Sequence, residues 1–501
     1  MTPNQYTPEE PISSIATALA PAALGIVRVS GKGCIELVSK VFSRPKALLA
    51  AAGNTLVYGW IIERKRNKFG VTDDVRIDEV MLAVYRAPKS FTGEDMVEIF
   101  CHGGPAVVMA IQNLMLKIGF RQANRGEYTF RAFINGKTDL TKAEAVKEII
   151  DSHTDVSRSH AAGRLAGSLF EEIDSIKKLI IDTLAAIEVE IEYPEDEETI
   201  ADSFDREDIE TAVKRLQALV DSWRGEKLYQ DGARVVLAGR TNAGKSSLFN
   251  AILKEERAIV SDIEGTTRDW LESWASINGI PVRLFDTAGL RQTSDVIEAQ
   301  GVEISRSLVH DADLVLYLVD GTQGMNDEDC QFIEKCQEPL IVVYTKGDKC
   351  KDMDCSAPLA MTGRCGVSPL EGEAEAPVAS VSLRKEAGAG GRLSPSCKIS
   401  SKTGEGLAEL FKQIYGILTA GIAGAATERS QAGLGSARQK DAVAAALESV
   451  RHALVSADDN YTLDAVVQDL EDALDSLGEV TGDVTPDDVL GSIFANFCVG
   501  K

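Results

Sequence analysis

The stretch that decides the fold is GRTNAGKSS, Gly239 to Ser247, which stands between the apolar run ARVVLA and the helix-like run SLFNAILK. It matches G-x-x-x-x-G-K-S in the strand–turn–helix context that a phosphate-binding loop requires. Backbone N–H groups in such a turn point at phosphate oxygens, and the N-terminus of the following helix adds its positive dipole. We therefore expect Lys245 to reach the β- and γ-phosphates of a nucleotide and Ser246 to bind Mg²⁺.

Two motifs further along the chain predict how the metal and the γ-phosphate are held. GTTRD, Gly265 to Asp269, lies where a switch loop should cover the metal, and Thr267 is its expected second hydroxyl ligand. DTAG, Asp286 to Gly289, ends the next suitable strand. Asp286 is placed to hold the magnesium shell, and Gly289 lets the backbone approach the γ-phosphate.

Two later loops predict that the base is guanine. TKGD, Thr345 to Asp348, follows an apolar run, and Asp348 can accept the two adjacent N–H donors of guanine, a pair that adenine lacks. ISSKTGEG, Ile399 to Gly406, is the fifth loop, in which residues 400–402 back the base with main-chain N–H groups. The guanine loop commonly begins with Asn. Because Thr345 stands there, we expect one contact to the base to be weakened while the Asp348 readout survives.

The means of hydrolysis is less obvious from these motifs. Many switch GTPases orient water with a glutamine directly after DTAG, but this chain has Leu290 there. Charge on the transferring phosphoryl group must also be neutralised, usually by an arginine. Asn242 offers another device, since its amide oxygen could hold a monovalent cation beside the phosphates; alternatively, Asn242 only shapes the turn.

The flanking sequence changes texture along the chain. Residues 1–140 contain short β-rich runs closed by Gly or Pro, such as ALGIVRVSGKG and DMVEIFCHGGP. From 233, short apolar runs separated by helix-length stretches predict a parallel sheet covered on both faces. Residues 350–396 are rich in Gly, Ala, Ser and Pro, which predicts a disordered surface insertion. Apolar residues at helical spacing predict long helices on both sides of the sheet, at Leu169, Ile173, Ile176, Ile180, Leu184, Ile187, Ile209, Val213, Leu216, Val220, Trp223, Val443, Leu447, Val450, Leu454, Val466, Leu470, Leu474 and Leu477.

Charge and composition limit the classes of protein. The chain has 53 Lys and Arg against 77 Asp and Glu, a net charge of −24, which argues against nonspecific binding to nucleic acid or anionic membranes. Residues 1–140 nevertheless carry 17 basic and 13 acidic residues, so the acidity belongs to the remainder. No apolar run approaches the roughly 20 residues of a membrane span, and residues 1–30 lack a cleavable signal pattern. With nine scattered cysteines, a cytoplasmic protein with reduced thiols is expected.

The flanks resemble the MnmE/TrmE family of bacterial tRNA-modification GTPases. The segments that carry the resemblance are GIVRVSG, SFTGED, CHGGP, RGEYTFRAFINGKTDLTKAEAV and the terminal FCVGK, which together extend over nearly the whole chain. The GTPase motifs alone would also fit a ribosome-assembly GTPase that only binds RNA, or a structural dimer with a vestigial GTPase domain. The first alternative leaves the flanks unexplained, and the intact motifs disfavour the second.

The resemblance implies a fold that combines α/β, α and α+β parts. A β-rich domain at 1–140 would bind tetrahydrofolate and form a homodimer. A helical domain would follow in two parts, 141–230 and 421–501. A P-loop GTPase domain with a parallel sheet, residues 231–420, would be inserted between those parts.

The resemblance also implies an activity. Such proteins hydrolyse GTP in a manner that depends on potassium and Mg²⁺, and they form a heterotetramer with the FAD-dependent protein MnmG, also called GidA. Together they add an aminomethyl or carboxymethylaminomethyl group to C5 of the wobble uridine, position 34, of certain tRNAs. A tetrahydrofolate derivative supplies the one-carbon unit.

Individual roles are carried over by motif position. Asn242 matches the family's potassium-binding asparagine, and a potassium ion there would replace an arginine as the positive charge. Glu298 matches a switch glutamate that orients water, unless it is a solvated helix charge. Cys498 is either a catalytic thiol or part of a packed helix end. With Lys245, these three are the expected catalytic residues. The expected potassium ligands are Asn242, Ser261, Ile263 and Thr266, and the expected folate contacts are Arg28, Glu98, Lys137 and Lys501.

The residues expected to bind GTP form one set. It contains Asn242, Ala243, Gly244, Lys245, Ser246, Ser247, Ser261, Asp262, Ile263, Glu264, Gly265, Thr266, Thr267, Asp286, Thr287, Ala288, Gly289, Thr345, Lys346, Asp348, Ser400, Ser401 and Lys402. Two segments depart from the family pattern. ATALAPAALGIVR lacks the arginine of a turn expected near the folate, and SARQKDAV replaces the usual NxRH-type helix segment.

Overall fold

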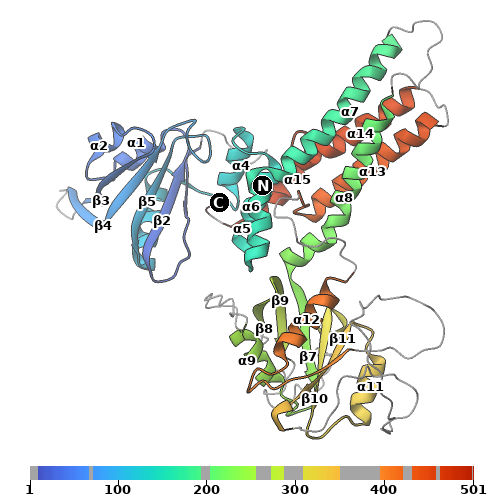
Figure 1. The fold of residues 1–501 in the computed structure, drawn as a ribbon. Coiled ribbons are helices and arrows are strands. Elements are labelled where there is room, and N and C mark those ends of the chain that lie inside the picture. Colours follow the sequence, from blue (N-terminus) through green and yellow to red (C-terminus); the bar gives the residue numbers. More distant parts are fainter. Residues whose placement is uncertain are drawn as a thin grey trace. The chain divides into compact units, whose positions relative to one another are not determined.

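The computed structural model describes residues 10–66, 72–192, 204–255, 272–286, 308–349, 395–420, 432–458, 463–498 and 500. The chain divides into two compact units (Figure 1). The first contains Met1–Asp151, His160–Trp223 and Glu428–Lys501, and the second contains Ser152–Ser159 and Arg224–Thr427.

The first unit begins with a six-stranded sheet in the order β3-β4-β5-β2-β1-β6. Neighbouring strands are antiparallel except for β1 and β6, which run parallel. The β-rich runs predicted from the sequence are confirmed as strands β2 and β5. The strands are β1 (Ile12–Ile15), β2 (Ala22–Ser30), β3 (Thr55–Arg66), β4 (Thr72–Tyr85), β5 (Met96–Gly103) and β6 (Arg121–Gln122).

Among the described residues, helices cover one face of this sheet. Helices α1 (Cys34–Ser39), α2 (Pro45–Leu49) and α3 (Pro105–Lys117) supply buried side chains to a core with residues of β2, β3, β4 and β5. Alternate residues of the same strands point to the opposite face. That face exposes Leu24 by 61%, Leu56 by 61%, Tyr58 by 52% and Met81 by 46%.

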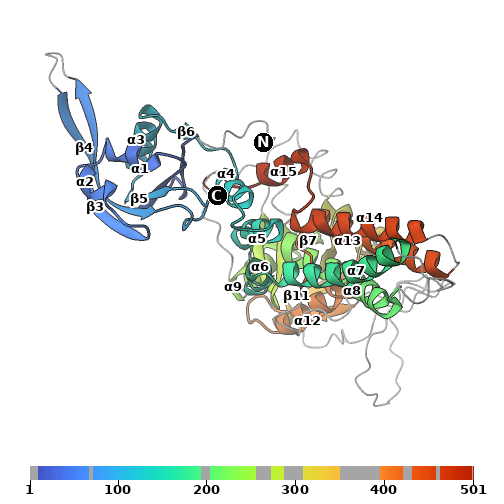
Figure 2. The same cartoon turned by 90° about the horizontal axis from the view of Figure 1, so that it is seen from above.

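Four long helices, α7, α8, α13 and α14, share one apolar core. Residues at the helical spacing found in the sequence are buried along α7, α8, α13 and α14, so the long helices predicted on both sides of the GTPase segment are confirmed. Figure 2 shows α14 beside both α7 and α13. The helices that lie wholly or partly in this unit, besides α1–α3, are α4 (Glu127–Ile134), α5 (Leu140–Asp151), α6 (Asp155–Ala166), α7 (Ser168–Glu192), α8 (Arg206–Asp231), α13 (Ala437–Asp458), α14 (Leu463–Thr481) and α15 (Asp487–Ala495).

The second unit contains a six-stranded sheet in the order β12-β11-β10-β7-β9-β8. All neighbouring strands are parallel except β8, which pairs antiparallel with β9 at the edge. The parallel sheet is therefore confirmed, but the antiparallel edge strand was not predicted. The strands are β7 (Ala233–Gly239), β8 (Glu272–Ile277), β9 (Ile280–Asp286), β10 (Leu314–Asp320), β11 (Leu340–Thr345) and β12 (Ser396–Lys398).

Helices cover both faces of this sheet, as the continuous apolar runs predict. Val235 and Leu237 of β7 belong to a core with α9 (Lys245–Glu255) and α12 (Leu407–Leu418). Val236 belongs to the opposite core, to which α11 (Asp327–Lys335) contributes. Parallel strands thus bring their carboxyl ends, and the loops that follow them, to one edge.

The predicted insertion, 350–396, reaches too far at its end. Ser396 is the first residue of β12, and its backbone pairs with β11. It therefore belongs to the sheet and not to the insertion. Residues 350–394 lie outside the described part of the chain. Within the described residues, no helix has both the length and the apolar character needed to cross a membrane.

Candidate functional site

The phosphate-binding loop connects β7 to α9. Its first residue, Gly239, has φ 135°, and a Cβ there would lie 2.4 Å from the carbonyl oxygen of Leu318 on β10. Glycine is therefore required by the close approach of two backbones. The buried Lys245 donates from Nζ to the carbonyl oxygens of Gly239 at 2.8 Å and Arg240 at 2.7 Å. The ammonium group thus lies on its own loop, where phosphate oxygens would be held.

Asn242 occupies the bend of this loop in the left-handed conformation, with φ 63°. Asparagine adopts positive φ several times more readily than most residues. The backbone alone therefore gives one reason for an asparagine here. The side chain is exposed, so its amide oxygen is also accessible to a ligand.

The expected magnesium position lies between α9 and the end of β9. The hydroxyl of Ser246 in the first turn of α9 donates to Oδ2 of Asp286 at 2.9 Å. A hydroxyl beside a carboxylate is the kind of oxygen pair that Mg²⁺ prefers. The structure therefore brings together the two described residues predicted to organise the metal.

The two guanine-recognition loops also come together. Asp348 lies in the short 3₁₀ helix Gly347–Lys349 after β11, and the hydroxyl of Ser400 donates to its Oδ1 at 3.0 Å. The N–H of Gly347 donates to the carbonyl oxygen of Ile399 at 2.9 Å. Asp348 and the loop at 400–402 are therefore neighbours, as the motif order predicts.

Asp320, at the end of β10, is a member of this region that the sequence motifs did not reveal. Its Oδ2 lies 2.6 Å from Nζ of Lys346 in the guanine loop. Burial raises the pKa of Asp320, but hydrogen bonds from Lys346 and Thr322 outweigh that effect and lower the pKa to about 2. Asp320 is therefore a permanent anion at neutral pH. Its only sequence signal is its place after the apolar run LVLYLV.

Several predicted site residues lie outside the described part of the chain, and their roles stay predictions. They are Ser261, Asp262, Ile263, Glu264, Gly265, Thr266, Thr267, Thr287, Ala288, Gly289, Glu298 and Lys501.

A second polar site lies in the sheet of the first unit. Arg28 of β2 and Glu98 of β5 are opposite each other in register, and Nη2 of Arg28 lies 2.6 Å from Oε1 of Glu98. Nη1 of Arg28 donates to the carbonyl oxygen of Gly500 at 2.9 Å. Its guanidinium carbon is 5.8 Å and 5.5 Å from the ring centroids of Phe91 and Tyr128. Two predicted folate contacts, Arg28 and Glu98, thus form an ion pair. The aromatic rings beside Arg28 were not predicted from the sequence.

Tyr85 completes the polar part of this site. Its hydroxyl donates to Oε2 of Glu98 at 3.3 Å. Burial and the neighbouring charge of Glu98 raise the pKa of Tyr85, so the phenol stays protonated and remains a donor. Lys137 is exposed, and its Nζ donates to the carbonyl oxygen of Pro88 at 3.0 Å.

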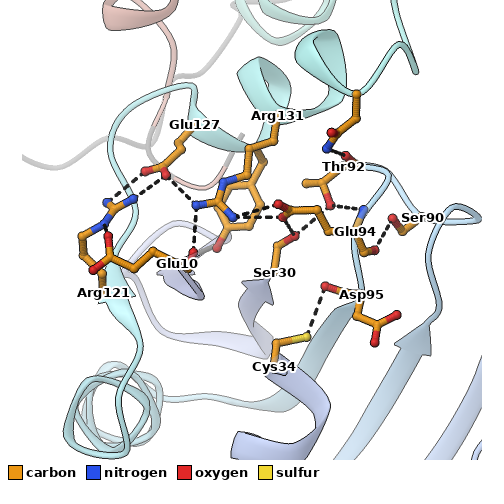
Figure 3. Close-up of polar contacts among 12 residues, drawn as sticks. Glu10, Ser30, Cys34, Ser90, Thr92, Glu94, Asp95, Arg121, Glu127 and Arg131 are labelled. Atoms are coloured by element: carbon orange, nitrogen blue, oxygen red, sulfur yellow. Dashed lines mark hydrogen bonds and ion pairs between the residues drawn. The ribbon is translucent and has the colours of Figure 1, made fainter. Parts of the chain in front are cut away.

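A buried ion network positions the loop that carries Phe91 (Figure 3). Arg131 of α4, which is fully buried, donates to Oε2 of Glu94 and to Oε1 of Glu127, each at 2.9 Å. The hydroxyl of Ser30 on β2 donates to the same Glu94 oxygen at 2.8 Å. The network therefore connects α4, the 90–95 loop and the strand that holds Arg28.

Two roles are predicted for Cys498, a catalytic thiol and part of a packed helix end, and the surrounding segment has features of each. Phe497 is buried, and its ring centroid lies 5.3 Å from that of Phe494, as expected of a packed helix end. Cys498 itself is an exposed free cysteine, so its thiol is accessible. The departure SARQKDAV also has a structural role, since Arg438 donates from Nη2 to Oε2 of Glu144 at 2.8 Å and so attaches α13 to α5.

The phosphate loop, the Ser246–Asp286 pair and the paired guanine loops, at one edge of a mostly parallel sheet, define a P-loop GTPase. Residues 140–498 match the model of the MnmE helical domain, and residues 11–137 match that of the GTP-binding protein TrmE N-terminus. The chain belongs to the MnmE family of tRNA modification GTPases. It is a GTP hydrolase with a role in tRNA modification, and the predicted fold class is confirmed.

Full-length relatives support this assignment. The proteins named tRNA modification GTPase MnmE from Treponema denticola and Treponema pallidum (strain Nichols) are 47% identical over 502 residues and 43% identical over 517 residues. The first alignment covers 99% of both chains and the second covers 100% of both. The relative of that name from Carboxydothermus hydrogenoformans is 38% identical over 503 residues, covering 98% of this chain and all of its own.

A solved structure is similar to part of the chain. The G domain of the T. maritima FeoB iron transporter is 26% identical, with 37% of this chain and 98% of that chain covered. Its TM-score is 0.23, so this likeness adds nothing to the family assignment.

Proposed function

We propose that this chain is a potassium-stimulated GTPase that works with an FAD-binding partner of the MnmG type. Together they add an aminomethyl or carboxymethylaminomethyl group to C5 of uridine 34 in certain tRNAs, with a one-carbon unit from a tetrahydrofolate derivative. The observation that carries the proposal is the presence, in one member of the MnmE family, of a GTPase site and of the separate Arg28–Glu98 site. A cytoplasmic location is part of the proposal.

GTP would occupy the loops of the second unit, with Mg²⁺ held by Ser246 and Thr267 and its shell held by Asp286. The metal neutralises phosphate charge when it is bound. Lys245 holds the β- and γ-phosphates in place, because its ammonium group already lies at the phosphate loop. Asp348 accepts from the guanine edge, and Ser400 fixes the carboxylate that does so.

Potassium would be held by Asn242 together with Ser261, Ile263 and Thr266. The exposed amide oxygen of Asn242 at the bend of the phosphate loop is a suitable ligand for a monovalent cation. The ion supplies positive charge where other GTPases use an arginine. Glu298 is proposed to orient the attacking water, because Leu290 stands where many GTPases have a glutamine.

The folate would lie at Arg28 and Glu98. A carboxylate can hydrogen-bond the aminopyrimidine edge of a pterin, and the rings of Phe91 and Tyr128 fit a flat aromatic ligand. Arg28 positions the Glu98 carboxylate through a salt bridge, and Tyr85 donates to its other oxygen. Lys137 and Lys501 would bind the glutamate tail, and Cys498 is a candidate catalytic thiol.

The proposed homodimer is supported by the uncovered face of the first-unit sheet. Leu24, Leu56, Tyr58 and Met81 expose large hydrophobic side chains on that face, and exposed apolar surface of this kind is typical of an interface. The net charge of −24 further predicts weak direct binding of tRNA by this chain alone. In the proposed heterotetramer, the MnmG-type partner carries most of the phosphate contacts.

The test is mass spectrometry of wobble uridines in tRNA from cells that lack this protein. We expect the C5-modified nucleoside to disappear and the unmutated chain to restore it. Lys245→Ala and Arg28→Ala should each fail to restore it at matched protein levels. Lys178→Ala, a substitution at an exposed helix position, is the control and should restore it. Persistence of the modified nucleoside in the deletion strain contradicts the proposal.

A further inference from the structure

The side chain of Thr345 faces the phosphate loop from the end of β11. Its hydroxyl donates to the carbonyl oxygen of Ala243 at 2.7 Å, and the carbonyl oxygen of Val319 lies at 3.3 Å. Thr345 is only 2% exposed. A threonine hydroxyl has a single hydrogen to donate, and both neighbouring carbonyl oxygens can only accept. The single hydrogen of this hydroxyl is therefore used in hydrogen bonding to these backbone carbonyl oxygens.

The surrounding backbone fixes Thr345 in this position. The carbonyl oxygen of Thr345 accepts from the N–H of Gly321 at 3.1 Å. A Cβ on Gly244 would lie 3.4 Å from Oγ1 of Thr345, so the phosphate loop packs directly on this side chain. The next residue, Lys346, is held by its ion pair with Asp320. The guanine loop is thus attached to β10 and to the phosphate loop before any nucleotide arrives.

This commitment limits which atoms of guanine can be read. The N7 and O6 atoms of guanine are acceptors, so reading them requires a donor. An asparagine in this place has two N–H donors and one acceptor, and can hold the phosphate loop and donate to the base together. Thr345 has no further hydrogen to offer. Asp348, in contrast, accepts from N1–H and the 2-amino group, and its carboxylate is fixed by Ser400.

We propose that Thr345 is a positioning residue that ties the guanine loop to the phosphate loop and leaves N7 of guanine unread. Guanine is recognised through its N1 and 2-amino edge, so a nucleotide altered only at N7 binds as GTP does. The inference rests on the proposed placement of GTP at these loops.

The experiment compares dissociation constants of three nucleotides with the full-length protein in the presence of Mg²⁺. In 7-deaza-GTP, C–H replaces N7, and ITP lacks the 2-amino group. We expect the unmutated chain to bind GTP and 7-deaza-GTP within about twofold of each other, since no net hydrogen bond is lost. ITP should bind roughly tenfold or more weakly, because a hydrogen bond to a charged carboxylate is lost.

Three variants separate a tether from a base contact. Thr345→Val keeps the side-chain shape but leaves the Ala243 carbonyl without its donor. It should weaken GTP and 7-deaza-GTP equally, by roughly 2- to 10-fold, and leave their ratio unchanged. Thr345→Ser should restore GTP affinity. Thr345→Asn should raise the preference for GTP over 7-deaza-GTP by roughly 2- to 10-fold, since it introduces a donor.

The outcomes that overturn the inference are distinct from those that overturn GTP binding here. If the unmutated chain binds 7-deaza-GTP about fivefold or more weakly than GTP, the difference is larger than one weak hydrogen bond gives. If Thr345→Val also abolishes that difference, Thr345 contacts N7 and the inference is wrong. Unchanged GTP affinity in Thr345→Val would show that the hydroxyl does not hold the phosphate loop in place. If Thr345→Asn gained no preference for GTP over 7-deaza-GTP, the residue type at this position would not decide whether N7 is contacted. Equal binding of ITP and GTP would instead contradict the placement of the base at Asp348. Thermal unfolding of each variant verifies that it is folded.

Discussion

The GTPase site takes its contacts from short loops that each follow one strand of a parallel sheet, whereas the site around Arg28 takes them from segments far apart in the chain. Ser246 and Asp286 are 40 residues apart, but Arg28 and Gly500 are 472 residues apart. The first site relies largely on backbone groups and loop position, and the second on long side chains held by other side chains. The two sites should therefore respond differently to substitution.

Lys245→Ala is expected to give the largest difference between its effects on the two sites. Removing the ammonium group from the phosphate loop should lower kcat for GTP hydrolysis by roughly 100- to 1000-fold, since a charge aimed at the transferring phosphoryl group is lost. Binding of tetrahydrofolate by the same variant, measured by titration calorimetry, should be unchanged. A fall in both kcat and folate affinity would show that the two sites do not function independently.

Arg131→Met tests the dependence of the Arg28 site on buried side chains. The substitution removes the buried cation that Glu94 and Glu127 share, although Glu127 keeps its ion pair with Arg121, so the free energy of unfolding should fall by about 3 kcal/mol. Arg64→Met, at an exposed ion pair in the same sheet, is the matched control and should change it by about 0.5 kcal/mol or less. Equal effects in chemical denaturation would contradict the importance assigned to the network.

Asn242 can be tested so that its two roles separate. GTP hydrolysis by the unmutated chain should be faster in potassium than in sodium by roughly 10-fold or more, as expected of a charge near the transition state. Asn242→Gly adopts φ 63° without strain but lacks the amide oxygen. It should lose this stimulation if the side chain binds the ion, and retain it if asparagine only shapes the turn.

Arg28→Ala should weaken tetrahydrofolate binding by about 10-fold, because the Glu98 carboxylate loses the charged partner that positions it. Lys117→Ala, which removes an exposed lysine of α3 that pairs with Glu63 of β3, is the matched control and should bind folate normally. Calorimetric titration measures both. Unchanged affinity in Arg28→Ala would remove Arg28 from the site.

The smallest effect is a pH dependence in the first unit. The hydrogen bond to Asp78 raises the pKa of His102 above its ordinary value. The stabilisation is therefore complete below the unfolded pKa of about 6.5 and is lost as pH rises through the folded pKa. The difference in thermal midpoint between the unmutated chain and His102→Gln should be larger at pH 6 than at pH 9. A difference that grows with pH would contradict this assignment.

The sequence predicted the GTPase site better than its counterpart because the chemistry of the GTPase site is local. Lys245, Ser246 and Asp348 stand in short motifs whose spacing implies their neighbours. Tyr85 stands in no such motif, and the family segment that contains Arg131 does not indicate its partners, so their roles arise only when distant elements pack together. The helical spacing predicted α7, α8, α13 and α14, since one buried stripe defines each helix.

The edge strand β8 was missed for a different reason. Asn278 and Gly279 both have positive φ and form a tight turn, so β8 and β9 are a hairpin within a sheet that is otherwise parallel. The predicted rhythm of strand and helix has no place for a hairpin. The motif alone shows that Thr345 replaces the usual asparagine, but the direction of its hydroxyl toward Ala243 depends on the tertiary fold.

The shared core of α7, α8, α13 and α14 has a consequence for synthesis on the ribosome. Helix α8 ends at Asp231 and α13 begins at Ala437, so about 200 residues separate the two halves of this core. At about 5–20 residues per second, the first half waits roughly 10–40 seconds for its partner. The GTPase unit can fold during that delay, while the apolar stripe of α7 and α8 remains without its final cover. During this period the exposed stripe makes the nascent chain prone to aggregation.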